Sequence, residues 1–208
     1  MAFAMNEVVL HYQIPIAAFR PYESREFQDS LPAPPPSTLF GMLMSLCGLP
    51  VEERERLAGI QIASAICLPE PARGTVLRRM RRGGTTAKRN PEYQELLIGL
   101  RGLVAVRDAS NDFPELIRTA LKEPEKVSRF GGLSLGESAF LLDSLNVGWP
   151  GDETLLWLIN DSTGDLSLTT WIDTAHPSET RRVRFRFEEM SVDSVPDEAW
   201  VSLKPETG

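Results

Sequence analysis

Hydrophobic and polar side chains alternate along residues 6–14, where Val8, Leu10, Tyr12 and Ile14 fall on one face. A period of two is typical of a β-strand with one buried face. Beyond residue 37 the period lengthens, and apolar residues recur every three or four positions, which predicts a helix over 38–48. The apolar stripe of this helix consists of Leu39, Met42, Leu43, Leu46 and Cys47.

Four prolines within residues 32–36 lie directly before the predicted helix. A proline-rich segment is extended and has little conformational entropy left to lose, so it fixes the position of the helix after it. Ser37 and Thr38 are expected to cap the helix, because hydroxyl oxygens accept hydrogen bonds from the free amides of a first turn. The N-terminal end of the helix is therefore predicted to be held in place and open to a ligand.

The rest of the chain continues as strands and helices. A short charged helix is expected at 51–59, and a second amphipathic helix after Asp112, ended by Pro124. Gly99 and Gly102 are expected bulge points within a strand. Strands are predicted at 60–68, 95–107, 138–147 (where the pattern also fits a helix), 153–159, 165–172 and 181–189.

The first six main elements follow the order β-α-β-β-α-β, which is that of a ferredoxin-like (RRM-like) α+β domain. We therefore predict a ferredoxin-like domain over 1–147 with an inserted basic hairpin at about 73–93. Residues 148–208 are predicted to form a C-terminal β extension packed against it.

Positive charge is concentrated in the predicted hairpin, although the net charge of the chain is −7. Residues 73–89 contain seven basic residues and no acidic one, whereas the rest of the chain, with 15 basic and 29 acidic residues, carries −14. Gly83 and Gly84 at its centre indicate a projecting hairpin or a flexible arm. Such an arm binds phosphates through counterion release, and arginine planes stack on unpaired bases, which favours single-stranded RNA. A solvated loop and a docking arm for an acidic protein are the alternatives.

A second basic pattern lies at residues 181–187, where Arg182, Arg184 and Arg186 share one face of a predicted strand. An arginine-lined face follows a nucleic-acid backbone, but charged side chains also protect exposed sheet edges from aggregation. The sequence favours neither interpretation.

Residues 129–138, RFGGLSLGES, match the P-loop spacing from Gly131 to Gly136 and Ser138. Glu137 stands where a P-loop needs lysine, and a carboxylate repels phosphates, so an NTPase is not expected. The histidines belong to no Cys/His cluster, and no metal or cofactor is predicted. His11 is expected in the first strand and His176 in a surface turn.

The composition is that of a soluble globular protein, with 42% hydrophobic and 25% charged residues. No apolar run is long enough to span a membrane, and the N-terminal residues do not resemble a signal peptide. Two cysteines are too few for a disulfide framework, so we expect a cytoplasmic protein.

Three segments resemble a known family: residues 17–48, 88–101 and 129–138. They are similar to the RAMP-superfamily CRISPR-associated subunit that caps the 5′ handle of crRNA in type I Cascade complexes, in its short, myxobacterial-type subtype. The first segment carries a Phe-Arg pair, Phe19-Arg20, then Pro-Pro-Ser-Thr at 35–38 and an early helical glycine, Gly41.

The resemblance implies an RNA-binding subunit that holds the 5′ handle of the guide RNA. Its implied protein partners are the large subunit and the first backbone subunit, with target DNA as a further contact in the assembled complex. The basic hairpin corresponds to the family's thumb, which reaches over the RNA. The implied RNA-binding residues are Phe19, Arg20, Arg25, Ser37, Thr38, Arg78, Arg79, Arg81, Arg82, Lys88, Arg89, Arg129, Gly131 and Gly132.

One departure from the family pattern concerns catalysis. Members that cleave precursor RNA resemble metal-independent ribonucleases with a tyrosine in the first helix and a Lys-His pair in the hairpin. Here the first helix has Phe40, and the hairpin has Lys88-Arg89 without a histidine. Acid–base cleavage needs a group that titrates near neutral pH, and arginine does not. We expect no catalytic residues, with a processing endoribonuclease, in which Tyr93 would be the nearest candidate, as the alternative.

Overall fold

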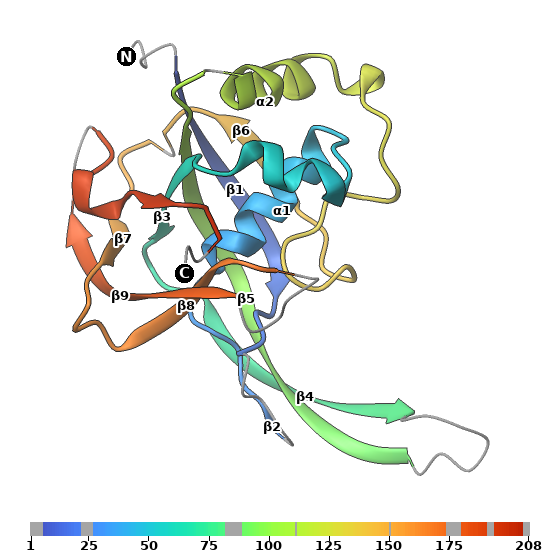
Figure 1. Cartoon of the computed structure of the whole chain (residues 1–208). Helices are drawn as coiled ribbons and strands as arrows, with labels where there is room; N and C mark the ends of the chain where they lie inside the picture. Colours follow the sequence, from blue (N-terminus) through green and yellow to red (C-terminus); the bar gives the residue numbers. More distant parts are fainter. Residues whose placement is uncertain are drawn as a thin grey trace.

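The computed structural model of the chain describes residues 6–21, 27–81, 89–110, 112–149, 151–173, 180–190 and 194–205; of residues 27, 79–81 and 89–92 only the backbone is described. Over these residues the fold is α+β, with two α-helices against a mostly antiparallel sheet (Figure 1). The strands are β1 (Glu7–Ala17), β2 (Phe27–Gln28), β3 (Gln61–Cys67), β4 (Ala72–Arg81), β5 (Arg89–Arg107), β6 (Ser144–Val147), β7 (Leu155–Asn160), β8 (Leu166–Trp171), β9 (Arg181–Met190) and β10 (Val201–Ser202). The helices are α1 (Pro36–Leu46) and α2 (Asp112–Lys122), with 3₁₀ turns at Val51–Leu57, Pro124–Lys126 and Asp197–Ala199.

The sheet follows the order β6-β1-β5-β3-β7-β9-β8, with β10 paired to β3 and both β2 and β4 paired to β5. Strand β2 runs parallel to β5, and the other described pairs are antiparallel. The C-terminal strands thus extend the same sheet beyond β3. The division of the chain into two domains at residue 147 stays a prediction.

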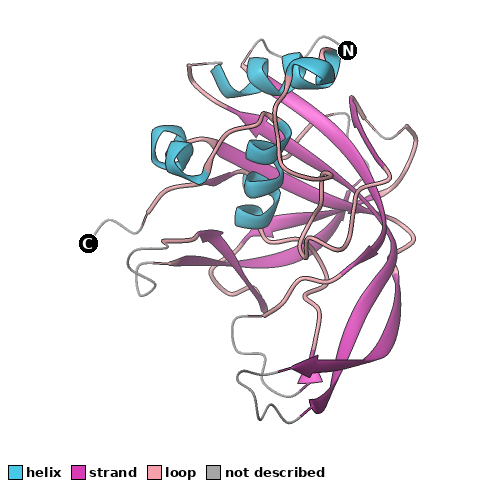
Figure 2. Cartoon of the chain, turned by 90° about the vertical axis from the view of Figure 1, so that its right-hand side faces the viewer, coloured by secondary structure: helices cyan, strands magenta, loops and turns pink. Residues whose placement is uncertain are grey.

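Strand β5 belongs to two parts of the molecule. Its C-terminal half pairs with β1 on one edge and β3 on the other, while its N-terminal half pairs with β4 along ten positions, from Ala72 opposite Ile98 to Arg81 opposite Arg89. This second part, together with β2, projects from the rest of the structure (Figures 1 and 2). We call strand β4 and residues 89–98 of β5 the ribbon.

Each face of the sheet carries an apolar core. Helices α1 and α2 cover one face (Figure 2), where the Phe40 ring lies 5.8 Å from that of Phe113 and 6.3 Å from that of Trp171. The three aromatic rings therefore connect α1 with α2 and β8. A smaller cluster on the other face contains Trp157 and Trp200.

Helix α1 begins earlier than expected. Its N-cap is Pro35 and its first residue Pro36, while Ser37 and Thr38 lie inside the first turn and make no side-chain cap. Proline is favourable at the first helical position, because its fixed φ suits a helix and its missing N–H is not needed there. The proline run thus starts the helix rather than only preceding it.

Three other expectations and one alternative need correction. The segment 51–59 forms a 3₁₀ helix over Val51–Leu57, and the strand expected at 138–147 is confined to Ser144–Val147. The β1–β5 register runs without a shift from Glu7 to Ala17, so Gly99 and Gly102 make no bulge in it. Strand β9 lies between β7 and β8, so its arginines do not protect a sheet edge.

In the part of the chain that the structure describes, no helix has the length and apolarity needed to cross a membrane.

Two glycines give opposite predictions for stability. A Cβ on Gly102 would collide with the Tyr12 phenol and lie 2.8 Å from the Ala65 carbonyl oxygen, whereas a Cβ on Gly41, inside α1, would meet nothing within 4 Å. We expect Gly102→Ala to destabilise the fold by about 1–3 kcal/mol through overpacking. Gly41→Ala should stabilise it by about 0.5–1 kcal/mol, because alanine favours helix. Urea denaturation of both variants checks this, and equal midpoints would contradict the packing described here.

Candidate nucleic-acid interface

One carboxylate connects the ribbon to the body of the protein. The Glu137 Oε1 atom accepts hydrogen bonds from Arg20 Nε at 3.1 Å and Gln94 Nε2 at 2.7 Å, and it lies 3.0 Å from Arg20 Nη2. Its other oxygen, Oε2, accepts from Arg78 Nη1 at 2.9 Å, and Arg78 also donates to the Gln94 amide oxygen. The segment after β1, strand β4, strand β5 and the loop before β6 therefore meet at a single side chain.

The backbone before Glu137 explains how this carboxylate is held. Gly136 has a φ of +87°, and a Cβ there would lie 2.7 Å from the Ala18 carbonyl oxygen and 3.1 Å from the Phe19 ring. Glycine is needed for both reasons, since other residues rarely adopt this φ and no room exists for a side chain. The close approach fixes the loop against the end of β1, where Arg20 follows.

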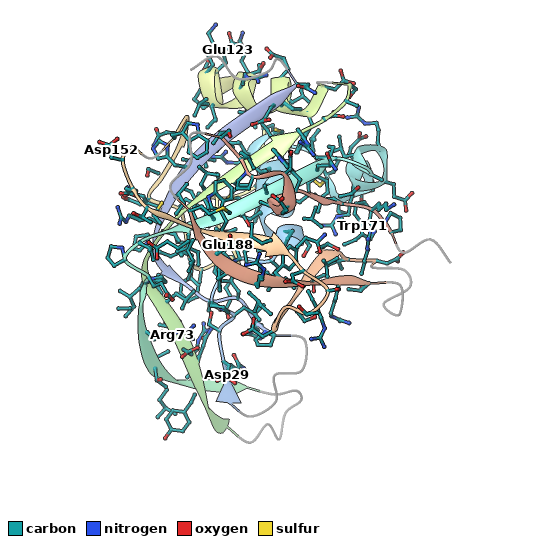
Figure 3. All side chains as sticks on the ribbon, turned by 90° about the vertical axis from the view of Figure 1, so that its left-hand side faces the viewer. Asp29, Arg73, Glu123, Asp152, Trp171 and Glu188 are labelled. Carbon is teal, nitrogen blue, oxygen red and sulfur yellow. The ribbon has the colours of Figure 1, made fainter. Side chains whose placement is uncertain are left out.

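A second carboxylate holds the ribbon on the opposite side of β5. Glu95 Oε2 lies 2.8 Å from Arg73 Nη1 and accepts a hydrogen bond from the Ser30 amide at 3.1 Å. The Ser30 hydroxyl oxygen in turn accepts from the Phe19 amide at 3.0 Å. Figure 3 shows Arg73 and Asp29 on the projecting part of the molecule, away from Trp171 and Glu188.

These contacts change the electrostatics expected from the sequence. Burial raises the pKa of Glu137. Hydrogen bonds from Arg78, Arg20 and Gln94 and the charge of Arg20 lower it by a larger amount, so the pKa lies below its ordinary value of 4.5. Glu137 is therefore charged at neutral pH. Arg73 and Arg78, the two basic residues of 73–89 whose side chains are described, both make ion pairs within the chain.

Two cavities lie at the N-terminal end of α1. One, of about 230 Å³, is lined by Phe19, Arg20, Pro35, Thr38 and Glu137 among others. The other, of about 250 Å³, shares Arg20 and Pro35 with it and is bounded on its far side by Ser167, Thr169 and Arg182. The N-terminal end of α1, with its partial positive charge, and Arg20 therefore border both cavities, Arg182 borders the larger one and Glu137 the smaller one. A helix N-terminus beside arginine side chains favours an anion.

The predicted site residues fall into three groups. Arg20, Arg78 and Thr38 lie at the network or the cavities, whereas Arg129, Gly131 and Gly132 lie on an exposed loop elsewhere in the segment before β6. Arg25, Arg82 and Lys88 lie outside the described residues, as does His176, and Arg79, Arg81 and Arg89 are described by their backbone only.

Two of the predicted residues have buried side chains. Phe19 is 2% exposed and Ser37 is 3% exposed. The Phe19 ring packs beneath Gly136, and its backbone holds Ser30 and Leu31. Phe19 therefore positions the loop that carries Glu137 and the segment around Ser30.

Sequence reasoning missed Gln94, Glu95 and the role of Glu137. The partners of Glu137 lie 43, 59 and 117 positions away in the chain, so no local pattern connects them. The sequence presents Arg182 only as part of an arginine-lined strand. Its place beside α1 depends on the path of β8 and β9 around that helix.

The described residues offer little for acid–base or metal chemistry. Burial raises the pKa of the Tyr12 phenol, and it raises those of Cys47 and Cys67 to about 12, so none of these groups ionises near neutral pH. His11 Nδ1 hydrogen-bonds with the Gly148 carbonyl group at 3.2 Å. Among the described residues, no group of three or more histidine, cysteine or acidic side chains is placed to hold a metal.

Known proteins share both the sequence and the fold of this chain, although no family model matches it. The CRISPR-associated protein Cas5 of Myxococcus xanthus (strain DK1622) is 31% identical over 198 residues, which cover 88% of this chain and 91% of that protein. A chain of a CRISPR RNA-guided surveillance complex has a similar fold, with a TM-score of 0.62 at 14% identity, covering 96% of this chain and 91% of that one. A Cas protein crystal structure gives a TM-score of 0.56 at 15% identity, covering 89% and 95%.

Removal of the Glu137 carboxylate should weaken the connection between the ribbon and the body. Glu137→Ala leaves the buried Gln94 amide and Arg78 without their acceptor, and we expect a loss of about 1–3 kcal/mol at neutral pH. Because the pKa of Glu137 is lowered on folding, its contribution is present above pH 4.5 and is lost as the pH falls through the folded value. The difference from wild type should therefore shrink below pH 4.5.

Thermal unfolding of wild type and variant across this pH range provides the measurement. Glu115→Ala is the matched control, because Glu115 is 63% exposed and pairs only with Arg118 one turn along α2 among its described ion pairs. Its effect should stay below about 0.5 kcal/mol at every pH. A Glu137→Ala effect that does not change with pH would contradict the electrostatic account.

Proposed function

Because the chain belongs to the Cas5 family of CRISPR-associated proteins, we propose that it is a non-catalytic subunit of a type I Cascade surveillance complex and binds the 5′ handle of the crRNA. The observation that carries this proposal is the basic ribbon. Its strands cover residues 72–81 and 89–98, and the sequence has seven basic residues within 73–89.

The ribbon suits a single-stranded polyanion better than a compact ligand. Its two strands pair over ten positions and project from an otherwise acidic molecule. The basic residues are therefore spread along the strands and not gathered at one point. Each phosphate that an arginine or lysine neutralises releases counterions, which supplies affinity without base recognition. Arginine planes and the half-exposed Tyr93 ring add surfaces on which unpaired bases can stack.

The N-terminal end of α1 supports the same proposal. Pro35 and Pro36 fix the start of the helix, and Arg20 and Arg182 line the cavities beside it. A helix N-terminus flanked by arginines favours phosphate groups. We infer that the handle passes from the ribbon toward these cavities.

The sheet order supports the finer fold assignment as part of this proposal. Strands β6, β1, β5 and β3 are adjacent in that order, with α1 between β1 and β3 in the chain and α2 between β5 and β6. We infer that these elements form the ferredoxin-like unit expected from the sequence, and that the ribbon is its inserted hairpin, the thumb.

Protein partners are inferred from the same assignment. We infer contacts with the large subunit and the first backbone subunit of the complex, with target DNA nearby, in the cytoplasm. Exposed apolar side chains on the loop between α2 and β6, Phe130 and Leu141, are suited to contacts between subunits.

The proposal includes the absence of nuclease activity, for chemical reasons. Helix α1 has no tyrosine, and its one aromatic residue, Phe40, is buried between Phe113 and Trp171. The hairpin sequence has no histidine, and an arginine does not exchange protons near neutral pH. A processing endoribonuclease is the alternative, and a cleavage assay distinguishes the two.

Incubation of the purified protein with end-labelled repeat RNA, in the presence of a chelator, tests binding and cleavage together. We expect retention of intact RNA that weakens as salt is raised, with a slope that reports the number of phosphates bound. A single discrete cut at the repeat boundary, lost in a Tyr93→Phe variant, would show a processing endoribonuclease instead.

A charge-matched pair of variants locates the RNA on the ribbon. Changing Arg78, Arg79, Arg81 and Arg82 to alanine should lower the RNA affinity at least tenfold, because several phosphate contacts are lost. The control removes four exposed positive charges elsewhere: Arg56, Lys122, Lys126 and Lys204. Equal affinities of the two quadruple variants in a filter-binding assay would contradict the assignment of the ribbon.

A further inference from the structure

The donors around Glu137 are of the kind that bind phosphate groups, but in this structure they bind the Glu137 carboxylate. Two arginines and one amide from three separate segments converge on the two oxygens of one side chain. Resting on the proposed function, we propose that Arg20, Arg78 and Gln94 form a phosphate-binding site for the RNA backbone. Glu137 occupies this site in the free protein and is displaced when RNA binds.

The donor geometry supports this inference. Arg20 presents both Nε and Nη2 to Glu137 Oε1, at 3.1 and 3.0 Å, which is the side of the guanidinium that holds carboxylates and phosphates. Arg78 approaches the other oxygen at 2.9 Å, and Gln94 completes the set at 2.7 Å. The non-bridging oxygens of a phosphodiester need the same kind of convergent donors. Both ligands carry one negative charge.

The arginine side chains of this cluster are accessible to solvent, unlike those of an ion pair within a protein core. The side chains of Arg20 and Arg78 are 45% and 36% exposed, and that of Glu137 is 19% exposed. Gln94 is 1% exposed, so its amide becomes available to a ligand only when Glu137 leaves. Glu137 also lines the cavity of about 230 Å³ at the N-terminal end of α1, together with Arg20 and Thr38. A phosphate can therefore approach the arginines from solvent, and the carboxylate has space to move aside.

The consequence for recognition is selectivity rather than tighter binding. An RNA phosphate gains the donors only after it replaces the contacts of Glu137, so a weakly positioned phosphate gains little at this site. When the ribbon and α1 already hold the RNA backbone, one of its phosphates is present at high local concentration and displaces the Glu137 carboxylate. Glu137 thereby reduces binding of unrelated RNA, since specificity is a difference between two affinities.

Charge-matched glutamine variants test the proposal. Glu137→Gln removes the competing charge with little change in shape, and Glu115→Gln changes the net charge equally at an exposed i,i+3 pair on α2. Fluorescence anisotropy measures the affinity of wild type and both variants for repeat-derived RNA and for unrelated single-stranded RNA of the same length, over a salt series. Thermal unfolding confirms that each variant is folded at the assay temperature.

We expect Glu137→Gln to bind the unrelated RNA about three- to tenfold more tightly than wild type, with a smaller gain for the repeat RNA. The salt slope for the unrelated RNA should rise by about 0.7 for each additional phosphate held. Glu115→Gln should stay within about twofold of wild type, because it frees no arginine at the interface. Adding Arg20→Ala and Arg78→Ala to Glu137→Gln should remove the gain.

Two results would overturn the inference while leaving the proposed function in place. If Glu137→Gln and Glu115→Gln bind alike, Glu137 does not compete with RNA. If folded Glu137→Gln binds more weakly than wild type, the carboxylate orients the arginines instead of blocking them. A failure of wild type and all variants to bind RNA at low salt would overturn both the proposed function and this inference.

Discussion

The structure depends on the continuity of strand β5 between the body and the ribbon. The strand has 19 residues, which corresponds to about 60 Å at the usual rise per residue. Its C-terminal half is buried between β1 and β3, and its N-terminal half forms the ribbon with β4. The direction of the basic ribbon is therefore set by main-chain hydrogen bonds of the core rather than by a flexible joint. At the junction, Gly99 has a φ of +72°, which glycine adopts without strain.

The charged residues are distributed unevenly between the body and the ribbon. The molecule is acidic overall, yet its ribbon is basic, and the two carboxylates Glu95 and Glu137 lie where the ribbon joins the body. They pair with Arg73 and Arg78, the two arginines of the ribbon whose side chains the structure describes. This distribution fits the proposed binding of RNA, because local positive charge determines where a phosphate backbone lies.

Sequence patterns predicted the parts of the structure that depend on nearby residues. The alternation at Val8–Ile14 and the stripe from Leu39 to Leu46 record burial on one face, and both elements are present. For residues 73–93 the sequence predicted a basic hairpin, but it started the following strand at residue 95, because residues 89–94 are mostly polar and show no alternating pattern; in the structure β5 begins at Arg89 and pairs there with β4. In the sequence, Glu137 stands out only as a replacement for a P-loop lysine, since its partners are brought to it by the sheet. The family resemblance supplied the function, and the network that shapes the interface came only with three-dimensional contacts.

Photo-crosslinking with repeat RNA that carries 4-thiouridine along the 5′ handle, followed by mass spectrometry of the linked peptides, tests the central claim most directly. If the ribbon and the N-terminal end of α1 hold the handle, the crosslinks fall within residues 73–98 and beside Arg20 and Thr38. Crosslinks confined to the opposite face of the sheet, around Trp149 and Trp200, would contradict this account.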